Sequence, residues 1–150
     1  MRTIEYKLAF KDFNNALKKN QLLGLNCKAC GKYTCPPKLT CHECGSTDLE
    51  LACLSGRGHI VTFTSSYVTA QGREVEAPIL VVMVELEEGP WIMGNLVGVD
   101  PAKVTMEILI GQSVYLTSTR MLPADQYAGG NEVKGGIARP TFALLEKENK

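Results

Sequence analysis

The first periodic pattern in the chain is an apolar stripe of helical spacing near the N-terminus. Within residues 9–20, AFKDFNNALKKN, the apolar residues Phe10, Phe13 and Leu17 recur with Asp, Asn and Lys between them. This spacing predicts a short amphipathic helix. Two phenylalanines are a large apolar load for a helix of about three turns. The stripe therefore packs either on the protein's own core or on the surface of a partner, and both interpretations stay open.

After this helix the pattern changes to that of strands. Residues 21–27, QLLGLNC, predict a short strand that leads into a cysteine-rich segment. Residues 48–68 predict a long β-stretch, because side chains alternate in character through its second half, HIVTFTSS. Gly56 and Gly58 flank a single arginine in this stretch, which predicts a bulge or a sharp bend there.

The middle of the chain predicts a hairpin followed by a short helical element. Residues 70–78 are polar and predict a loop. Residues 79–86 and 91–97 are apolar and predict two strands, with a turn at residues 87–90. Residues 100–109 begin with Asp and Pro, which are typical of a helix N-terminus, so a short helix or turn is expected there.

The C-terminal part contributes two more strands. Residues 113–119, SVYLTST, predict one of them, and residues 139–146, RPTFALLE, predict another that can close the sheet. The connection between these two strands is rich in glycine, and we expect it to be a mobile loop. Its glycines are Gly129, Gly130, Gly135 and Gly136.

The order of these elements predicts the fold class. Five strands, of which the first is long and bent at glycines, with a short helix between the third and the fourth, are typical of a small closed barrel of the OB type. We therefore expect a mainly β protein. Its N-terminal helix and cysteine-rich segment are expected in residues 1–47, and the five-stranded OB-fold barrel, glycine-rich loop and C-terminal strand in residues 48–150.

The cysteine-rich segment has the spacing of a metal site. Its pattern, C-x2-C-x10-C-x2-C, pairs Cys27 with Cys30 and Cys41 with Cys44, and a glycine follows each pair. Two residues between thiolates let one tight turn direct both sulfur atoms at a metal ion. The pattern predicts a zinc ribbon with one structural zinc ion per chain, because four thiolates fill a tetrahedral site and leave no position for water or substrate.

Other interpretations of this segment stay open. Iron also fits four thiolates, and redox-active CxxC pairs or buried free thiols compete with the metal site. If the metal is structural, its removal is expected to unfold the first third of the chain, because an isolated ribbon has little core of its own.

Two cysteines and both histidines fall outside the metal pattern. Cys35 directly precedes Pro36, and a residue in that position is driven to an extended conformation, so Cys35 is interpreted as a non-ligand, with a reactive thiol as the alternative. Cys53 lies in a strand pattern and is interpreted as a small core residue. His42 is not needed as a ligand beside two cysteines, and His59 is interpreted as a surface or hydrogen-bonded histidine.

Charge and length narrow the possible classes of protein. The 150 residues include 16 Lys and Arg and 16 Asp and Glu, a formal net charge of zero. Residues 1–50 carry eight basic and five acidic side chains, whereas residues 51–100 carry two basic and six acidic ones. A polyanion such as DNA therefore meets no strong positive field on the predicted barrel.

Targeting and catalytic motifs are not apparent in the sequence. The apolar runs are too short to cross a bilayer, and the N-terminus MRTIEYKLAFKDF has no apolar signal-peptide core. We therefore expect a cytoplasmic protein without membrane contact, and in that compartment cysteine clusters more often bind metal than form disulfides. Because no Ser/His/Asp arrangement, P-loop or dinucleotide fingerprint is visible, no residue is assigned a catalytic role.

The succession of motifs resembles a known family. LLGLNC, two CxxCG pairs around a double proline, LSGRGHIVTFT, APILVVMVELEEG and IGQSV follow one another in this order. This order resembles the acyl-CoA-associated zinc-ribbon and OB-fold proteins grouped as DUF35, over roughly residues 10–119. The resemblance implies a rubredoxin-like ribbon whose ligands are the four paired cysteines. The chain departs from the family at Lys38, where many members have arginine. It looks most similar to the small subunits of thiolases that act on aromatic acyl-CoA intermediates.

The resemblance also implies a function. Family members accompany larger thiolase-like subunits, which carry the catalytic residues, so this chain is expected to be a non-catalytic partner that stabilises or positions the acyl-CoA site. A CoA thioester would then bind at the interface, through residues that the sequence does not identify. The alternatives are a single-stranded nucleic-acid binder, since zinc ribbons and OB folds both serve that role, and an enzyme that uses Cys35. The acidic barrel segment disfavours the first, and the lack of a base beside Cys35 disfavours the second.

Overall fold

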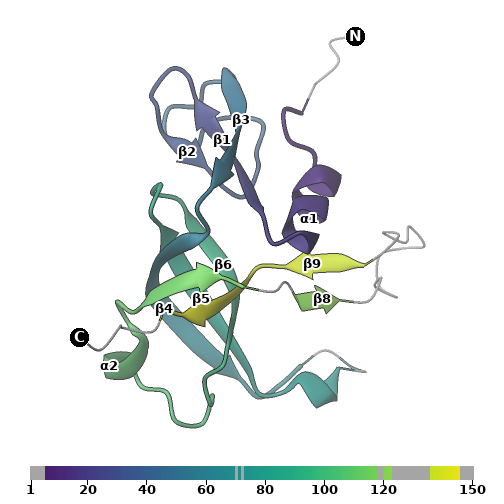
Figure 1. The fold of residues 1–150 in the computed structure, drawn as a ribbon, viewed down its shortest axis with the longest axis vertical. Coiled ribbons are helices and arrows are strands. Elements are labelled where there is room, and N and C mark those ends of the chain that lie inside the picture. The colour runs from purple at the N-terminus through teal and green to yellow at the C-terminus, as the bar shows by residue number, and fades with distance from the viewer. Residues whose placement is uncertain (1–5, 70, 72, 118–119, 123–135, 146–150) are drawn as a thin grey trace.

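The computed structural model describes residues 6–69, 71, 73–117, 120–122 and 136–145. Two small sheets and a closed barrel account for its strands (Figure 1). One short helix contacts strands of the two small sheets, and another contacts the barrel. In chain order the elements are α1 (Phe10–Lys18), β1 (Leu22–Cys27), β2 (Tyr33–Thr34), β3 (Leu49–Leu54), β4 (Arg57–Ser66), a 3-10 helix (Glu74–Glu76), β5 (Ile79–Leu86), β6 (Trp91–Val97), α2 (Met106–Leu109), β7 (Ser113–Leu116), β8 (Arg120–Leu122), β9 (Ile137–Arg139) and β10 (Thr141–Leu144).

The cysteine-rich segment is framed by a three-stranded sheet of order β2-β1-β3. Strand β3 pairs antiparallel with the whole of β1, from Leu22 opposite Leu54 to Cys27 opposite Leu49. The predicted long β-stretch is therefore two strands, since β3 joins the ribbon sheet and β4 joins the barrel. The predicted bend separates them at Gly56, whose φ of +72° suits glycine far better than any other residue. The boundary placed between residues 47 and 48 stays a prediction.

The barrel confirms the predicted fold class. Its five strands follow the order β10-β6-β5-β4-β7, and β10 closes the barrel by pairing parallel with β6 and antiparallel with β7. The hairpin of β5 and β6 has the predicted bounds. The helix between the third and fourth barrel strands is α2, which begins after a turn at Asp100 rather than at Asp100 itself. The C-terminal strand closes the barrel as predicted, although it is shorter than expected.

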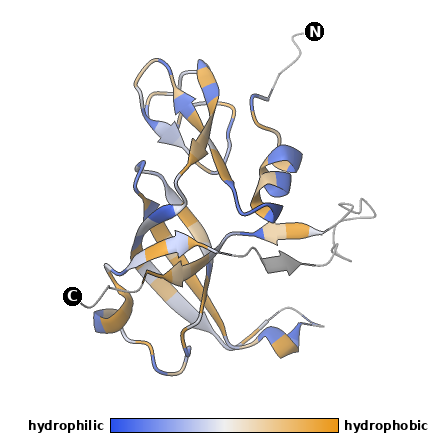
Figure 2. Cartoon of the chain, in the orientation of Figure 1, coloured by the Kyte–Doolittle hydropathy of each residue, from blue (hydrophilic) through white to orange (hydrophobic). Residues whose placement is uncertain are grey.

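Helix α1 packs on the protein's own core. Phe13, Ala16 and Leu17 are buried, whereas the side chain of Phe10 is 56% exposed. Figure 2 shows the rest of α1 as largely hydrophilic. Two of the three residues of the predicted apolar stripe therefore pack on the protein's own core, and Phe10 is the one that is exposed to another contact.

A polar residue on the same helix holds the C-terminal region. Asn14 is buried, and its Nδ2 donates to the carbonyl oxygen of Gly136 at 3.2 Å, while its Oδ1 accepts from the N–H of Ala138 at 2.6 Å. These bonds join α1 to β9, which lies beside the end of the helix in Figure 1. The N-terminal helix is thus tied to a strand more than a hundred residues away in sequence.

One hydrophobic core runs from the ribbon into the barrel. Alternate residues of β5 are buried, as a strand with one face on a barrel interior requires. Phe142 and Ile60 are fully buried, in one cluster with Leu17 and Leu25. Of the predicted glycine-rich loop, only Gly136 lies within the described residues. None of the helices described here is long and apolar enough to cross a membrane.

Candidate metal centre

The first pair of cysteines lies where β1 ends and the chain turns. Cys27 is the last residue of β1, and Cys30 lies in the turn that follows. The N–H of Gly31 donates to the carbonyl oxygen of Cys27 at 2.8 Å, and the N–H of Cys27 donates to that of Lys32 at 2.8 Å. Gly31 has a φ of +76°, a left-handed conformation that lets the turn fold back under the sulfur atoms.

The second pair repeats this turn. The N–H of Gly45 donates to the carbonyl oxygen of Cys41 at 2.9 Å, and the N–H of Cys41 donates to that of Ser46 at 2.9 Å. Gly45 has a φ of +75°. A Cβ atom at Gly45 would meet no other atom within 4 Å, so the glycine is required by backbone conformation and not by lack of space.

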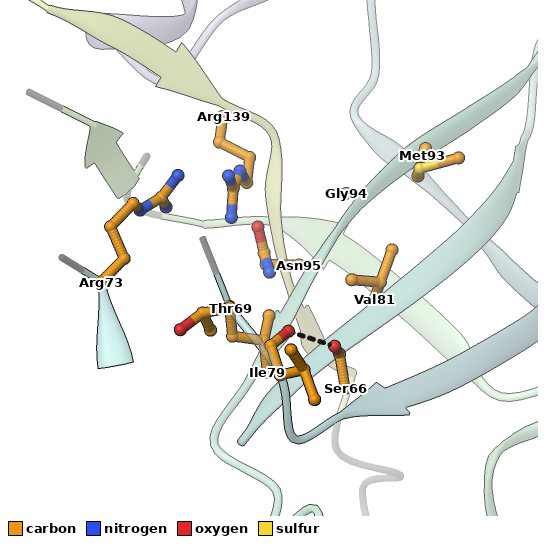
Figure 3. A pocket seen from close by; sticks show the side chains of 10 residues that line it. Ser66, Thr69, Arg73, Ile79, Val81, Met93, Gly94, Asn95 and Arg139 are labelled. Carbon is orange, nitrogen blue, oxygen red and sulfur yellow. Dashed lines mark hydrogen bonds between the residues drawn. The ribbon is translucent and has the colours of Figure 1, made fainter. Parts of the chain in front are cut away.

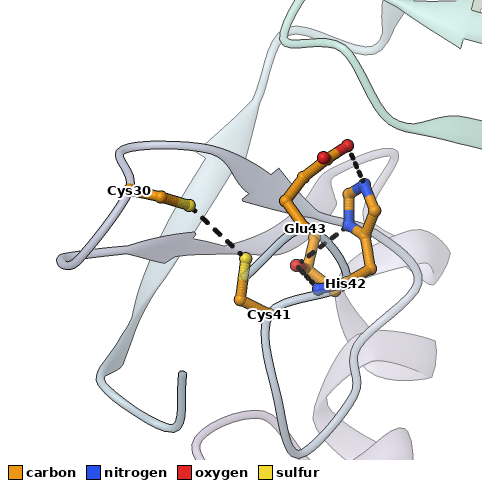
Figure 4. Close-up of polar contacts among 5 residues, drawn as sticks. Cys30, Cys41, His42 and Glu43 are labelled. Atoms are coloured by element: carbon orange, nitrogen blue, oxygen red, sulfur yellow. Dashed lines mark hydrogen bonds and ion pairs between the residues drawn. The ribbon is translucent and has the colours of Figure 1, made fainter. Parts of the chain in front are cut away.

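The two turns bring the four predicted ligands together. The sulfur atoms of Cys27, Cys30, Cys41 and Cys44 all lie within 4.8 Å of one another. The distance between sulfur atoms is 3.6 Å for Cys27 and Cys44. It is also 3.6 Å for Cys30 and Cys41, the pair drawn in Figure 4. A tetrahedral centre with zinc–sulfur bonds of about 2.3 Å places its sulfur atoms about 3.8 Å apart. The donor set and the spacing therefore fit a zinc ion.

Backbone dipoles at the site favour deprotonated sulfur. The N–H of Cys44 is the largest influence that lowers the pKa of the Cys41 thiol to about 6, against the opposing effect of burial. The N–H of Cys30 lowers the pKa of Cys27 in the same way. The pKa values of Cys30 and Cys44 are raised instead, although the N–H groups of Lys32 and Ser46 lower them, because burial and the neighbouring sulfur atoms oppose a further charge. Metal binding needs thiolates at all four positions. Cys27 and Cys41 are also buried, where an uncompensated charge would be costly.

Cys35 lies apart from the four-sulfur cluster. Its thiol is buried and donates to the carbonyl oxygen of Leu23 at 3.7 Å. Burial, with a smaller contribution from the charge of Glu88, raises the pKa of Cys35 to about 12. A thiol with so high a pKa is a poor nucleophile near neutral pH, which disfavours the interpretation of Cys35 as a reactive group.

The histidines make polar contacts that the sequence did not reveal. Nδ1 of His42 lies 3.2 Å from Oγ1 of Thr34, and Nε2 lies 3.2 Å from a carboxylate oxygen of Glu43, both away from the sulfur cluster (Figure 4). His59 faces Glu85 across β4 and β5, with Nε2 3.4 Å from the carboxylate. In the part of the chain that the structure describes, neither histidine is hydrogen-bonded to a serine or a cysteine.

The interpretation of Cys53 as a core residue was wrong. Its side chain is exposed, on the same side of β3 as the exposed Leu51. The alternation of β3 cannot give its burial, since neither set of alternate residues in this strand is buried throughout.

The fold and the four-sulfur site define a protein with a zinc ribbon followed by an OB-fold barrel. Two family models match in the same order. Residues 15–50 match "ChsH2, rubredoxin-like zinc ribbon domain", and residues 53–117 match "ChsH2, C-terminal OB-fold domain".

Individual relatives place the chain more narrowly. A "DUF35 domain-containing scaffold protein" of Methanocaldococcus jannaschii is 31% identical over 99 residues, which cover 65% of this chain and 70% of the relative. A "Probable enoyl-CoA hydratase alpha subunit" of Thermomonospora curvata is 33% identical over 89 residues, 59% of this chain but 28% of that protein. A chain of the solved structure "Ltp2-ChsH2(DUF35) aldolase" is 28% identical, with a TM-score of 0.64 and coverage of 96% of this chain and 98% of that one.

The chain belongs to the DUF35 family. The predicted family resemblance is therefore confirmed, together with the zinc-ribbon and OB-fold architecture that it implied.

Proposed function

We propose that this chain is a non-catalytic, zinc-binding partner subunit of a larger, thiolase-like acyl-CoA enzyme. Cys27, Cys30, Cys41 and Cys44 hold one structural zinc ion per chain. The chain stabilises or positions the acyl-CoA site, whose catalytic residues belong to the larger subunit. A cytoplasmic location is part of the proposal, because the four thiols stay reduced in that compartment.

Membership of the DUF35 family is the observation that carries the proposal. Relatives are named scaffold proteins, and the solved structure that matches almost the whole chain is named as an aldolase with two named components, of which one is the DUF35 protein. The name of the Thermomonospora relative adds a link to enoyl-CoA chemistry. That the larger subunit is thiolase-like rests on the family resemblance.

The charge distribution supports a protein partner over a nucleic acid. Residues 51–100 carry two basic and six acidic side chains, and these residues include three of the five barrel strands. A groove for single strands needs basic residues interleaved with stacking aromatics. The acidic barrel segment therefore gives the single-stranded nucleic-acid alternative little support.

Purification of the tagged chain from its native cells tests the proposal. We expect a stable complex with a larger subunit that mass spectrometry identifies as thiolase-like. The complex should turn over an acyl-CoA thioester, and the isolated chain should not. Recovery of a lone, stable monomer would contradict the proposal. Salt-sensitive binding to single-stranded DNA at micromolar concentration would favour the alternative.

A further inference from the structure

The outer face of β5 and β6 is apolar over most of its length, with Glu85 opposite Trp91 at one end. The side chains of β5 that point away from the barrel interior include Ile79, Val81 and Met83. The outward side chains of β6 include Trp91 and Met93. Met83 lies directly opposite Met93 in the register of the two strands. These five residues form what we call the apolar strip. A barrel face in contact with water usually carries polar residues at such positions.

The apolar strip is too exposed to serve the protein's own core. Trp91 is 55% exposed and Met93 is 59% exposed. On the adjacent strand β4, the outward positions next to the strip are the exposed residues Thr62 and Thr64, so the apolar character is confined to β5 and β6. Tryptophan and methionine are enriched where proteins contact one another.

A groove of about 410 Å³ lies at one end of the strip, and Val81 and Met93 line it together with Asn95 and Arg139. Asn95 is only 2% exposed, and its Oδ1 is buried without a hydrogen-bond partner. A buried carbonyl oxygen that lacks a donor is costly, so the Asn95 oxygen is a ready acceptor for an N–H or O–H group that enters the groove.

Two arginines line the same groove. Figure 3 shows the guanidinium groups of Arg73 and Arg139 directed toward each other beyond the carboxamide of Asn95. Arg73 is paired with Glu76 through Nε and Nη2, at 2.8 and 2.6 Å. Arg139 has a partner as well, so neither guanidinium group is free for a bound molecule.

From these observations we infer that the apolar strip and its groove are the contact surface for the larger subunit, an inference that rests on the proposed function. The bound segment presents apolar side chains to the strip and an N–H group to Asn95. A small ligand in the groove would leave Trp91 uncovered, because Trp91 is not among the residues that line it and lies about 13 Å along the strand from Asn95. A protein surface covers both ends.

Affinity measurements on the reconstituted complex test this inference. The larger subunit that co-purifies with the chain is separated and recombined with wild-type or variant chain, and the dissociation constant is measured by calorimetry. Met93→Asp is expected to weaken binding by at least about 30-fold, because it places a charge in the strip. Met106→Asp is the matched control, since Met106 is also an exposed methionine, at 65%, but lies on α2. It should change affinity by less than about threefold.

Asn95→Leu separates a binding role from a structural one. Leucine keeps the branched shape of asparagine and removes the unpartnered oxygen, but it is larger and also removes the Nδ2 donor to the carbonyl oxygen of Leu80, so the melting temperature of the free chain should change little. Its affinity for the larger subunit should nevertheless fall by about tenfold, since the bound N–H group loses its acceptor. A drop in melting temperature with unchanged affinity would mean that Asn95 serves the fold alone.

The outcomes distinguish this inference from the function on which it rests. If the complex forms and Met93→Asp binds as tightly as Met106→Asp, the location of the interface is wrong and the proposed function stands. If no thiolase-like subunit is recovered, both fail. If the isolated wild-type chain dimerises and Met93→Asp abolishes the dimer, the strip binds a second copy of this chain and the inference is overturned.

Discussion

Replacing Asn14 with alanine is expected to loosen the junction between α1 and β9. The substitution removes two hydrogen bonds, the 3.2 Å bond to the carbonyl oxygen of Gly136 and the 2.6 Å bond from the N–H of Ala138. Both bonds are buried, so the backbone groups that remain lose their partners without access to bulk water. Each buried group left unpaired costs about 1–3 kcal/mol.

The expected loss in the free energy of unfolding is therefore roughly 2–4 kcal/mol, if some water reaches one of the two groups. This is a large share of the roughly 5–15 kcal/mol that a typical domain has. Asn15→Ala is the matched control, because Asn15 is the next residue of the same helix and its side chain is exposed. That control should change the free energy of unfolding by less than about 0.5 kcal/mol.

Urea denaturation followed by circular dichroism measures the two free energies, and hydrogen exchange locates the change. The N–H of Ala138 should lose protection in Asn14→Ala and keep it in Asn15→Ala. Equal stability of the two variants, or unchanged protection at Ala138, would refute the view that Asn14 joins the N-terminal helix to β9.

Four further results are expected. Chelation of the metal should remove protection from the ribbon before the barrel unfolds, and metal analysis should find one zinc per chain; a coloured, iron-containing preparation would contradict the assignment. Iodoacetamide near neutral pH should label the exposed Cys53 and spare Cys35, because burial raises the pKa of Cys35 from 9.0 to about 12. Mass spectrometry that finds both cysteines labelled would contradict this. For the same reason the unfolded chain loses that proton first, so stability should fall as the pH rises above about 9. Gly58→Ala should cost at least about 2 kcal/mol in urea denaturation, because its Cβ would overlap the carbonyl oxygen of Glu85, and a cost below about 0.5 kcal/mol would exclude that overlap.

The sequence predicted those parts of the fold that depend on local spacing. Each CxxCG pair predicts one tight turn, so Cys27 could be placed beside Cys30 and Cys41 beside Cys44 before any tertiary contact was known. The bounds of β5 and β6 could be predicted because their apolar runs end at a Glu-Glu-Gly-Pro turn. Such signals lie within a few residues of the element that they define.

The rest depends on partners that are distant in sequence. Asn14 looks like an ordinary polar residue of a helix surface, and only the position of β9 makes it a buried link. Asn95 follows the outward parity of β6, yet it is only 2% exposed within the groove that Met93 and Arg139 also line. Cys53 is the opposite case, since the sequence pattern predicts a core position and the side chain is exposed on an edge strand. In each case tertiary packing, and not periodicity, decides burial.

The ribbon and the apolar strip meet at a second groove. Its walls include Cys35 and Pro36 from the ribbon and Pro90 and Trp91 from the start of β6. The ribbon wall belongs to the segment between the two cysteine pairs, and the turns that carry the four cysteines lie at its two ends. If these cysteines bind zinc as proposed, the metal would hold in place the wall beside Trp91, at the end of the strip that lies farthest from Asn95, and its removal would disturb the proposed contact surface there.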